Sequence, residues 1–520
     1  MNLTIEPWIP VVWTDGRSGM VSLRAVFEHG HEIQDLAVRP HERIALMRLL
    51  ICVAQAALDG PADSDDWETC KPCIAPAALD YLRRWQHAFE LFGNGQRFLQ
   101  VAKLKKSAHE SDNSDDDEAS STSKLDLSFA SGNNSTLFDN AGGSERVFLQ
   151  AELALVLLTF QCFSPGGRIG VALWGGQETS GKGSSDHAPC LAGGMLHALL
   201  RGESMFETLH RNLTSKRQVE QFFGNDSWGK PVWEWMPTGP TDVAAVRNAN
   251  RSYLGRLVPL ARSIRLADGC KSLILANGLE YAPYSESGWR EPTATIVTRK
   301  VKGQPTRVVL AASIERAVWR ELHALTVKAV SQDTNGGPAA LQNISAQTAF
   351  DLWVGGLVAN KAKLVDTTES AFHVPAGMMK EQSQMVYEKG VRLAETAAIR
   401  VARAVTVYHK GLGDNLDRPE MRNRRQQIQN SATAQFWTDV ESAVSGLLEV
   451  AANPEILGLK SEWGQTPWGQ SILRAGFAAY EHACPHEIPR QIRAYALGLN
   501  ALFAAPAEQS ENETEKEVEA

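Results

Sequence analysis

The cysteines and an acidic run are the first places where residue types and spacing could support chemistry. Cys70 and Cys73 are two residues apart, the spacing of half a zinc site or of a redox pair, but a zinc site needs two further ligands and the sequence has no second pair of this kind. We therefore interpret them as free loop cysteines. Residues 110–118 carry six acidic groups and no basic one. Consecutive carboxylates without a rigid scaffold are poor metal ligands, so we predict a solvated loop there.

A catalytic set of residues is not apparent in the sequence. It contains no His-Glu-x-x-His motif and no glycine-rich phosphate loop that ends in Lys-Ser or Lys-Thr. A metal-dependent nuclease would need carboxylates or histidines clustered on a firm scaffold. We predict a protein that is not an enzyme and that holds no metal or other cofactor. A metal-dependent nuclease and a helical scaffold that binds only proteins are the alternatives.

Residues 163–170, Phe-Ser-Pro-Gly-Gly-Arg-Ile-Gly, could bind another molecule through their main chain. Pro165 stops the apolar run 153–160 that precedes it, and Gly166 and Gly167 allow positive φ without a side chain in the way. A nucleic-acid groove could then approach the backbone closely. Taken alone, this loop is better explained as a turn between two core elements.

Two single residues in other loops are further candidates for binding. Phe138 is the one aromatic residue of the polar, glycine-flanked loop 131–143. Its ring could stack on a base, and it could equally pin the loop to the core. Lys271 follows a turn signal at 268–269 between two predicted strands, where a lone lysine is most often a solvated charge.

A third candidate lies at 353–361. Apolar residues run up to Gly355 and Gly356, and polar residues follow within four positions, ending at Asn360 and Lys361. Spacing alone assigns these two polar residues no role.

The composition is that of an ordinary soluble globular protein of 520 residues, with 43% hydrophobic and 22% charged residues. This length allows two or more domains. No apolar run of about 18 residues predicts a membrane span, and the first residues lack the basic and apolar regions of a signal peptide. Seven cysteines, an odd number, are typical of reduced thiols in the cytoplasm, where we expect the protein.

The net charge of −8 is unevenly distributed. Residues 110–118 contribute six acidic groups, and residues 506–520 contribute six more against one lysine. The rest of the chain holds 51 basic and 48 acidic residues. Net charge therefore neither supports nor excludes a nucleic-acid partner, because local patches decide that question.

We predict that residues 1–375 form a large mixed α/β domain. The expected helices are 39–59, 77–92, one near 195–200, and 315–330. Residues 252–282 are expected to be β-structure, with strands at 264–266 and 273–275. Residues 107–124 are rich in Ser, Asp and Glu and are expected to be a disordered loop.

Residues 376–505 are predicted to form a four-helix bundle, because glycine thins out and four amphipathic stripes follow one another. The third and fourth stripes are Leu473, Phe477, Tyr480 and Cys484, and Ile488, Ile492, Tyr495, Leu499 and Leu502. The second helix starts with four arginines that are either a solvated face or a phosphate-contacting patch, namely Arg418, Arg422, Arg424 and Arg425. Residues 506–520 are predicted to be a disordered acidic tail. The predicted fold class is α+β.

Several separated stretches resemble one known family. They are Met1–Leu3 with Trp8–Val11, then Arg97–Gln100, then Phe163–Gly167. Their order and spacing and the final helix bundle resemble CasA, the large subunit of the type I-E CRISPR surveillance complex Cascade, over nearly the whole chain. No single stretch is specific, and the resemblance rests on their occurrence together in this order.

The resemblance implies a DNA-binding subunit that is not an enzyme. CasA-like proteins bind the short protospacer-adjacent motif (PAM) of foreign duplex DNA, start its unwinding and present the displaced strand to a separate helicase–nuclease. The implied partners are the other Cascade subunits, the CRISPR guide RNA, the target duplex and that helicase–nuclease, with no membrane.

The resemblance also implies roles for single residues. Phe138 and Asn140 match the family loop that reaches the 5′ end of the guide RNA and the PAM-proximal region. Gly166 and Gly167 fall in the family's glycine loop, which faces the PAM minor groove. Lys271 takes the place of the lysine that enters this groove.

Asn360 and Lys361 match the family's wedge, which splits the first base pairs. Here the chain departs from the family pattern, because a lysine stands where a glutamine is expected. The cysteine-rich zinc insertion of some members is also absent, which leaves no metal to predict.

Overall fold

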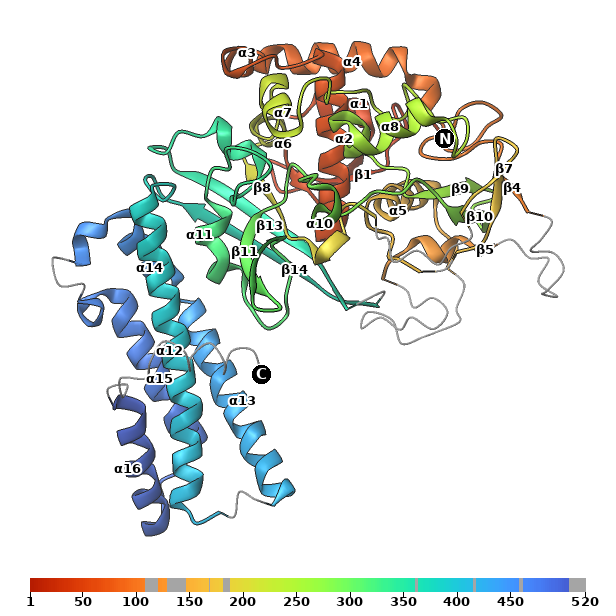
Figure 1. Ribbon diagram of the computed structural model, residues 1–520. Helices are drawn as coiled ribbons and strands as arrows, with labels where there is room; N and C mark the ends of the chain where they lie inside the picture. Colours follow the sequence, from red (N-terminus) through yellow and green to blue (C-terminus); the bar gives the residue numbers. More distant parts are fainter. Residues whose placement is uncertain are drawn as a thin grey trace. The chain divides into compact units, whose positions relative to one another are not determined.

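A computed structural model describes residues 1–107, 120–128, 146–167, 169–180, 188–360, 363–414, 418–457 and 462–504. The chain divides into two compact units, Met1–Val374 and Pro375–Ala520. Unit 1 combines helices with small antiparallel sheets and unit 2 is helical, so the predicted α+β class is confirmed (Figure 1). The acidic run at 110–118 and the tail at 506–520 lie outside the described residues.

Two buried helices form the centre of unit 1. They are α2, Pro40–Leu58, and α5, Gln150–Phe163. Both are buried around most of their circumference because apolar residues are not confined to one stripe. Helix α2 starts at a proline, whose fixed φ suits a first helical position. The helix expected at 39–59 is therefore confirmed, whereas that expected at 77–92 is the shorter α4, Ile74–Arg84, followed by the 3₁₀ turn η2, Gln86–Phe89.

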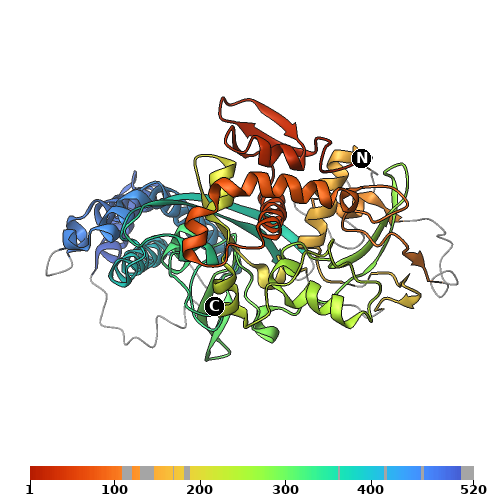
Figure 2. The same ribbon diagram turned by 90° about the horizontal axis from the view of Figure 1, so that it is seen from above.

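A small antiparallel sheet precedes these helices. Its strands are β1, Ile9–Trp13, β2, Ser18–Val21, and β3, Ile33–Leu36, in the order β2-β1-β3. Helix α1, Leu23–Glu28, follows β2 and begins at Ser22, whose hydroxyl accepts a hydrogen bond from Ala25 N. Figure 2 shows this sheet, in red, at the edge of unit 1.

The longest hairpin of unit 1 joins β13, Phe350–Asn360, to β14, Lys363–Val374. Strand β8, His197–Arg201, pairs with the other edge of β13. The helix expected near 195–200 is therefore wrong. A short apolar run has no intrinsic period that separates helix from strand, and here pairing with β13 decides the outcome.

A second hairpin consists of β9, Arg262–Leu266, and β10, Ser272–Asn277, which confirms the strands expected in this region. Strand β5, Ser120–Ser121, pairs with β10, and the 3₁₀ turn η4, Thr122–Leu125, follows it. Residues 120–124 are thus ordered, unlike the disordered loop expected at 107–124. Thr122 explains the difference, because it is fully buried against the hairpin.

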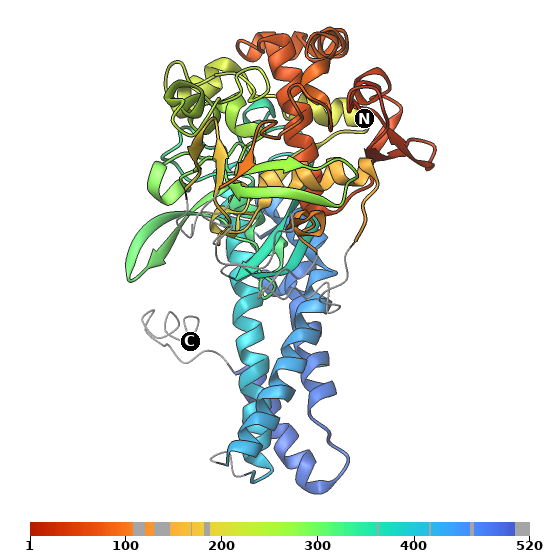
Figure 3. The same ribbon diagram turned by 90° about the vertical axis from the view of Figure 1, so that its right-hand side faces the viewer.

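A third hairpin, β11, Ile296–Val301, with β12, Gln304–Val309, extends away from the body of unit 1 (Figures 1 and 3). The remaining elements of unit 1 are α3 Ser64–Thr69, η1 Lys71–Cys73, β4 Lys105–Lys106, β6 Ala172–Trp174, β7 Gln177–Glu178, η5 Ala192–Gly194, α6 Met205–Arg211, α7 Lys216–Phe223, α8 Val243–Arg251, α9 Tyr253–Leu257, α10 Tyr284–Ser287, η6 Val318–Glu321, α11 Leu322–Leu325 and η7 Ala339–Asn343. Only η6 and α11 occupy the place of the long helix expected at 315–330.

Unit 2 is built around α12, Glu381–Gly411, which packs against α13, Pro419–Glu441, α15, Pro467–Ala483, and α16, Pro489–Phe503. Helix α14, Val444–Ala452, and the turns η8, Pro454–Leu457, and η9, Trp463–Gln465, join α13 to α15. Three of these helices start at proline, and Thr466 caps α15 by accepting a hydrogen bond from Gly469 N at 3.0 Å. The four expected helical patterns are present.

The faces that these helices bury match the expected stripes only in part, because Tyr480, Cys484 and Leu502 are buried and other members of the stripes are not. Leu473 and Phe477 of α15 are 50% and 38% exposed, and Ile488, before the start of α16, and Ile492 are both 53% exposed. Small residues lie at the helix contacts instead, for example Ala479 of α15 and Gly498 of α16. Close approach of the helices requires small side chains at these contacts, while other positions of α15 bury large side chains such as Trp468 and Ile472.

Within the described ranges, none of the helices combines the length and apolar character needed to cross a membrane.

Candidate nucleic-acid interface

The glycine loop begins where α5 ends. Ser164 N donates to Phe160 O at 2.8 Å, and Ser164 O accepts from Ala188 N at 2.9 Å. Gly166 is buried, whereas Gly167 is exposed and has a φ of +142°. A Cβ at Gly167 would have no heavy atom within 4 Å, so its main chain faces open space. Of the two predicted glycines, only Gly167 is exposed.

Hydrogen bonds connect this loop to the start of β9. Arg262 donates from Nη2 to Pro165 O at 2.6 Å. The Gln161 side chain donates to Arg262 O at 2.8 Å and accepts from Arg262 N at 2.9 Å. Gln161 is fully buried and Arg262 is 5% exposed, so these bonds are shielded from water. The glycine loop is therefore fixed to the β9–β10 hairpin.

Lys271 lies at the tip of the same hairpin and is exposed. Its carbonyl accepts from Thr122 N at 3.0 Å, and Cys270 O accepts from Thr122 Oγ1 at 2.9 Å. The turn uses positive φ at Gly269 and Cys270. Among the described residues, none contacts the Lys271 ammonium through a hydrogen bond or an ion pair. The main chain of Lys271 is thus fixed while its charge is available.

The glycine loop and Lys271 lie at opposite ends of one strand. Five residues of β9 separate the Arg262 contact from the turn, which corresponds to roughly 15 Å. A duplex rises about 3.4 Å per base pair, so one short duplex segment is long enough to contact both. The hairpin places the two features at a fixed spacing and does not bring them together.

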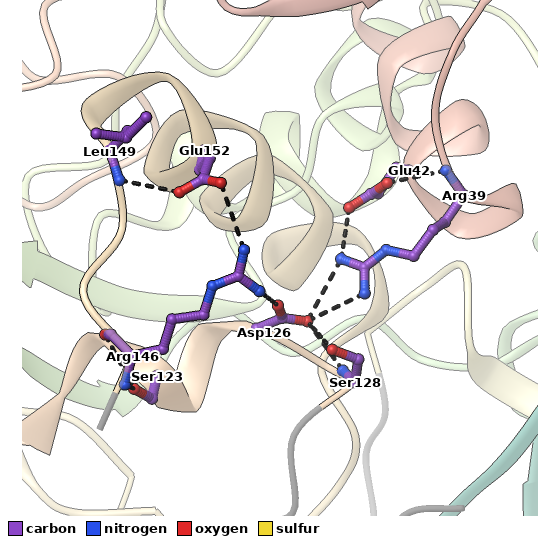
Figure 4. Close-up of polar contacts among 8 residues, drawn as sticks. All are labelled: Arg39, Glu42, Ser123, Asp126, Ser128, Arg146, Leu149 and Glu152. Carbon is purple, nitrogen blue, oxygen red and sulfur yellow. Dashed lines mark hydrogen bonds and ion pairs between the residues drawn. The ribbon is translucent and has the colours of Figure 1, made fainter. Parts of the chain in front are cut away.

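A buried carboxylate holds both ends of the predicted guide loop (Figure 4). Asp126, 3% exposed, accepts from Arg39 Nη1 at 3.3 Å and from Arg146 Nη1 at 3.4 Å. It also accepts from Ser128 N at 3.0 Å. Removing one partner of such a buried pair leaves an uncompensated charge, so these contacts define the local geometry.

Hydrogen bonds of Ser123 add to the contacts of Asp126 that hold the two ends of this loop together. Its Oγ accepts from Arg146 N at 3.0 Å, and Arg146 also pairs with Glu152 of α5 at 3.4 Å (Figure 4). Residues 123–128 and residue 146 are thereby held together across the segment between them. Phe138 and Asn140 belong to that segment and lie outside the described residues.

The predicted wedge is the end of the β13–β14 hairpin. Asn360 is the last residue of β13 and pairs with Lys363, and the register shifts between Val358 and Ala359. Lys361 lies outside the described residues. A Cβ at Gly356 would come within 2.8 Å of Met195 O, so this strand glycine permits close packing. The hairpin is therefore tightly packed before its end.

The β11–β12 hairpin is a basic surface that the sequence analysis missed. Its segment 296–309 contains Arg299, Lys300, Lys302 and Arg307 and no acidic residue, and residues 298–307 are all exposed. Lys302 and Gly303 form its two-residue turn with φ of 50° and 79°. A Lys-Gly turn between basic residues without a nearby acid was a signal present in the sequence. Two-stranded ribbons of this kind fit a major groove.

Burial favours the neutral forms of two titratable side chains of unit 1. Burial lowers the pKa of His41 to about 4, and its ring lies 6.2 Å from that of Phe163. Burial also raises the pKa of the Cys70 thiol to about 11, so this thiol is not activated. In the part of the chain that the structure describes, no group of three or more His, Cys, Asp or Glu residues could hold a metal ion. Arginine and lysine supply the local charge.

Comparison with known proteins gives one consistent result. The model of the family described as CRISPR-associated protein Cse1 matches residues 2–470. A CRISPR-associated protein CasA/Cse1 of Thermus thermophilus is 28% identical over 414 residues, which cover 76% of this chain and 75% of that protein.

Solved structures share the fold. Thermus thermophilus CasA (Cse1) superposes with a TM-score of 0.73 at 22% identity, over 96% of this chain and 98% of that one. Cse1 from Acidimicrobium ferrooxidans gives 0.72 at 19% identity, over 96% of both chains. A chain of a CRISPR RNA-guided surveillance complex gives 0.70 at 18% identity, over 97% and 99%.

Proposed function

The chain belongs to the CRISPR-associated protein Cse1 (CasA) family, and on this basis we propose that it acts as the large subunit of a type I-E RNA-guided surveillance complex that recognises a PAM in duplex DNA. Its proposed partners are the other subunits of the complex, a guide RNA, the target duplex and a helicase–nuclease that cuts the DNA. The subunit itself is not an enzyme in this proposal and works in the cytoplasm.

The observation that carries the proposal is the Arg262–Pro165 hydrogen bond, 2.6 Å long. It fixes the glycine loop to the hairpin whose tip is Lys271. The minor groove is about 6 Å wide, so main chain without a side chain, as at Gly167, can approach its floor more closely than main chain that carries one. The groove distinguishes A·T from G·C pairs far better than it distinguishes the pairs within each class. A lysine donor with main-chain contacts would therefore read a PAM loosely.

Strand separation is assigned to the end of the β13–β14 hairpin, with Asn360 and Lys361. Unstacking a base step costs a few kcal/mol, and the packed hairpin supplies a firm support for a wedge. Contact with the PAM offsets that cost first, after which RNA–DNA pairing is nearly balanced against the duplex it replaces. Lys361, in place of the family's glutamine, would add a phosphate contact.

Phe138 and Asn140 are assigned to contact with the 5′ end of the guide RNA and the PAM-proximal region. The Asp126 contacts support this assignment, because they hold the two ends of the segment that contains both residues. The basic β11–β12 hairpin adds a surface for phosphates on the same unit.

The test is duplex binding by the assembled complex with its guide, with and without a candidate PAM. Lys271→Ala should weaken binding to the PAM-bearing duplex about tenfold, the loss expected of one good groove contact, and should reduce the PAM preference. Lys230→Ala, which removes another exposed lysine of unit 1, should change neither quantity. Unchanged affinity of Lys271→Ala at physiological salt would contradict the proposal.

The alternative of a metal-dependent nuclease is tested with the same preparation. The chain with Mg²⁺ or Mn²⁺ should leave plasmid and linear DNA intact over hours, as judged by gel electrophoresis. Cleavage that is abolished by a chelator would favour the nuclease.

A further inference from the structure

The first half of α13 has no fully buried side chain and is mostly exposed. Of its side chains, only Ala432, Phe436 and Val440 are buried, all in the second half of the helix. A helix that is polar on all sides is usually supported by ion pairs between successive turns or by a partner. Among the described residues, no ion pair involves any side chain of residues 418–431. Within the part of this chain that the structure describes, the first half is supported by Gln429, whose side chain donates to Ala402 O at 2.8 Å and to Thr406 Oγ1 at 2.7 Å of α12, and not by ion pairs.

Arginines dominate this exposed half. Arg418, Arg422 and Arg425 are spaced four and three residues apart, which places them on one side of the helix within about 10 Å. Arg424 lies beside them. The only acidic residue of the first turn is Glu420.

The ends of two neighbouring helices extend this basic surface. Gly411, at the end of α12, lies where a Cβ would be 3.0 Å from Ala494 Cα of α16, and a Cβ at Gly413 would be 3.6 Å from Arg490 Nη2. Helix α12 ends with Lys410, and α16 begins with Arg490 and Arg493, all three exposed. Figures 1 and 3 show the end of α12 and the starts of α13 and α16 gathered at one end of unit 2. We name this surface the arginine end, and it consists of Lys410, Arg418, Arg422, Arg424, Arg425, Arg490 and Arg493.

The placement of these arginines is unfavourable for the isolated fold. Cations at a helix N-terminus oppose the helix dipole, typically by about 0.3–1 kcal/mol each. Both α13 and α16 begin with arginines. Arg425 Nε is buried without a hydrogen-bond partner among the described residues, which adds a desolvation cost. A ligand that carries negative charge would offset both costs.

We propose that the arginine end binds the phosphate backbone of nucleic acid without regard to sequence. Six of its seven cations are arginines, Lys410 being the exception, and the guanidinium group contacts phosphate through two parallel N–H bonds where lysine offers a point charge. Nucleic acid carries a phosphate every few ångströms along each strand, which suits cations spaced by one helical turn. This inference rests on the proposed function and adds to it a second contact, independent of the PAM.

The variant Arg418→Glu/Arg422→Glu tests it in the full chain. Glutamate is favourable in the first turn of a helix, so α13 should remain folded, as circular dichroism can verify. The matched control is Lys389→Glu/Arg392→Glu on α12, which changes the net charge equally and lies roughly 27 Å or more from the end of that helix. Binding to a duplex without any PAM is measured by fluorescence anisotropy from 50 to 200 mM salt.

The variant should bind the duplex at least about tenfold more weakly than the wild type, and the slope of log K against log salt should fall by about 2, as two lost phosphate contacts require. The control should change the affinity less than twofold. PAM preference, measured in the assembled complex, should survive in the variant and fall in Lys271→Ala. An equal loss in variant and control, or no loss in the variant, overturns the inference and leaves the PAM proposal standing.

If the wild-type chain binds no DNA, either alone or in the assembled complex, both proposals are wrong. A fluorescent peptide of residues 506–520 tests whether the arginine end binds an acidic protein segment in place of nucleic acid. If the variant loses affinity for this acidic peptide and keeps its affinity for DNA, the arginine end is a protein-binding surface and the inference is wrong.

Discussion

The cores of the two units are stabilised in different ways. In unit 1, Glu291 bonds Arg48 at 2.9 Å and Arg256 at 2.6 Å, and all three side chains are 4% exposed or less. In unit 2, the buried helical residues are mostly apolar, for example Val401, Phe436 and Ile472. Unit 1 buries whole charged side chains, whereas none of the described arginines of unit 2 is buried as a whole.

This difference affects how strictly the side chains of each core determine its fold. A buried charge is tolerated only with its partner in place, so the ionic core of unit 1 admits few alternative arrangements. An apolar core tolerates exchange of similar side chains if its volume is kept. We therefore expect unit 1 to be more sensitive than unit 2 to single polar changes, and the following experiments measure that contrast.

The largest effect is expected from Glu291→Gln. It removes the charge shared by Arg48 and Arg256, and breaking a buried ion pair in this way costs about 3–5 kcal/mol. The unfolding transition of unit 1 in urea should move to lower denaturant while that of unit 2 stays in place. Glu388→Gln, which breaks the exposed pair with Arg392 in unit 2, should cost less than about 1 kcal/mol. Equal costs would remove the contrast.

A smaller effect is expected from acid. Burial lowers the pKa of His41 and of His197 to about 4. Both rings are then neutral in the folded protein and bind protons on unfolding below their ordinary pKa of about 6.5, so stability is present above this pH and is lost as the pH falls toward 4. Each histidine contributes at most about 3 kcal/mol.

The check is the urea midpoint of unit 1 at pH 7, 5.5 and 4.5. In His41→Gln, the urea midpoint should decline less steeply between pH 6.5 and 4, because the contribution of His41 to the pH dependence of stability is removed. A decline of undiminished slope in this variant would mean that His41 is not held neutral by the fold.

The smallest effect is expected on the stripes that the sequence misassigned. Ile492 is 53% exposed, so Ile492→Ala should change the stability of unit 2 by less than about 0.5 kcal/mol. Ile472 of α15 is 4% exposed, and Ile472→Ala should cost about 2–4 kcal/mol. Thermal unfolding of the two variants distinguishes these values. Similar costs would indicate that the sequence stripe, and not the observed face, is the core.

Local patterns predicted local elements well. Helix α2 and the β9–β10 hairpin follow from apolar periodicity and from a turn signal. The strand β8 did not, because its conformation depends on pairing with β13, more than 140 residues away along the chain. The α15 and α16 faces were predicted only in part, because small buried residues such as Ala479 and Gly498 do not stand out in a pattern of large apolar residues.

The candidate site was predictable only in part. Lys271 at a hairpin tip and glycines after α5 could be read from residue types. The bond from Arg262 to Pro165 spans 97 positions and that from Thr122 to Cys270 spans 148. No local pattern encodes partners this distant, so the fixed spacing between loop and lysine became visible only in three dimensions.

Residues 122–126 have one more consequence, for how this family can vary. They are held to Cys270 and Lys271 at one end and to Arg39 and Arg146 at the other. We therefore expect relatives of this chain to differ in sequence length at 108–119 and at 129–145 without displacing Lys271, the residue proposed to contact DNA. The hydrogen bond of Thr122 and the ion pairs of Asp126 separate changes in those two segments from the position of Lys271.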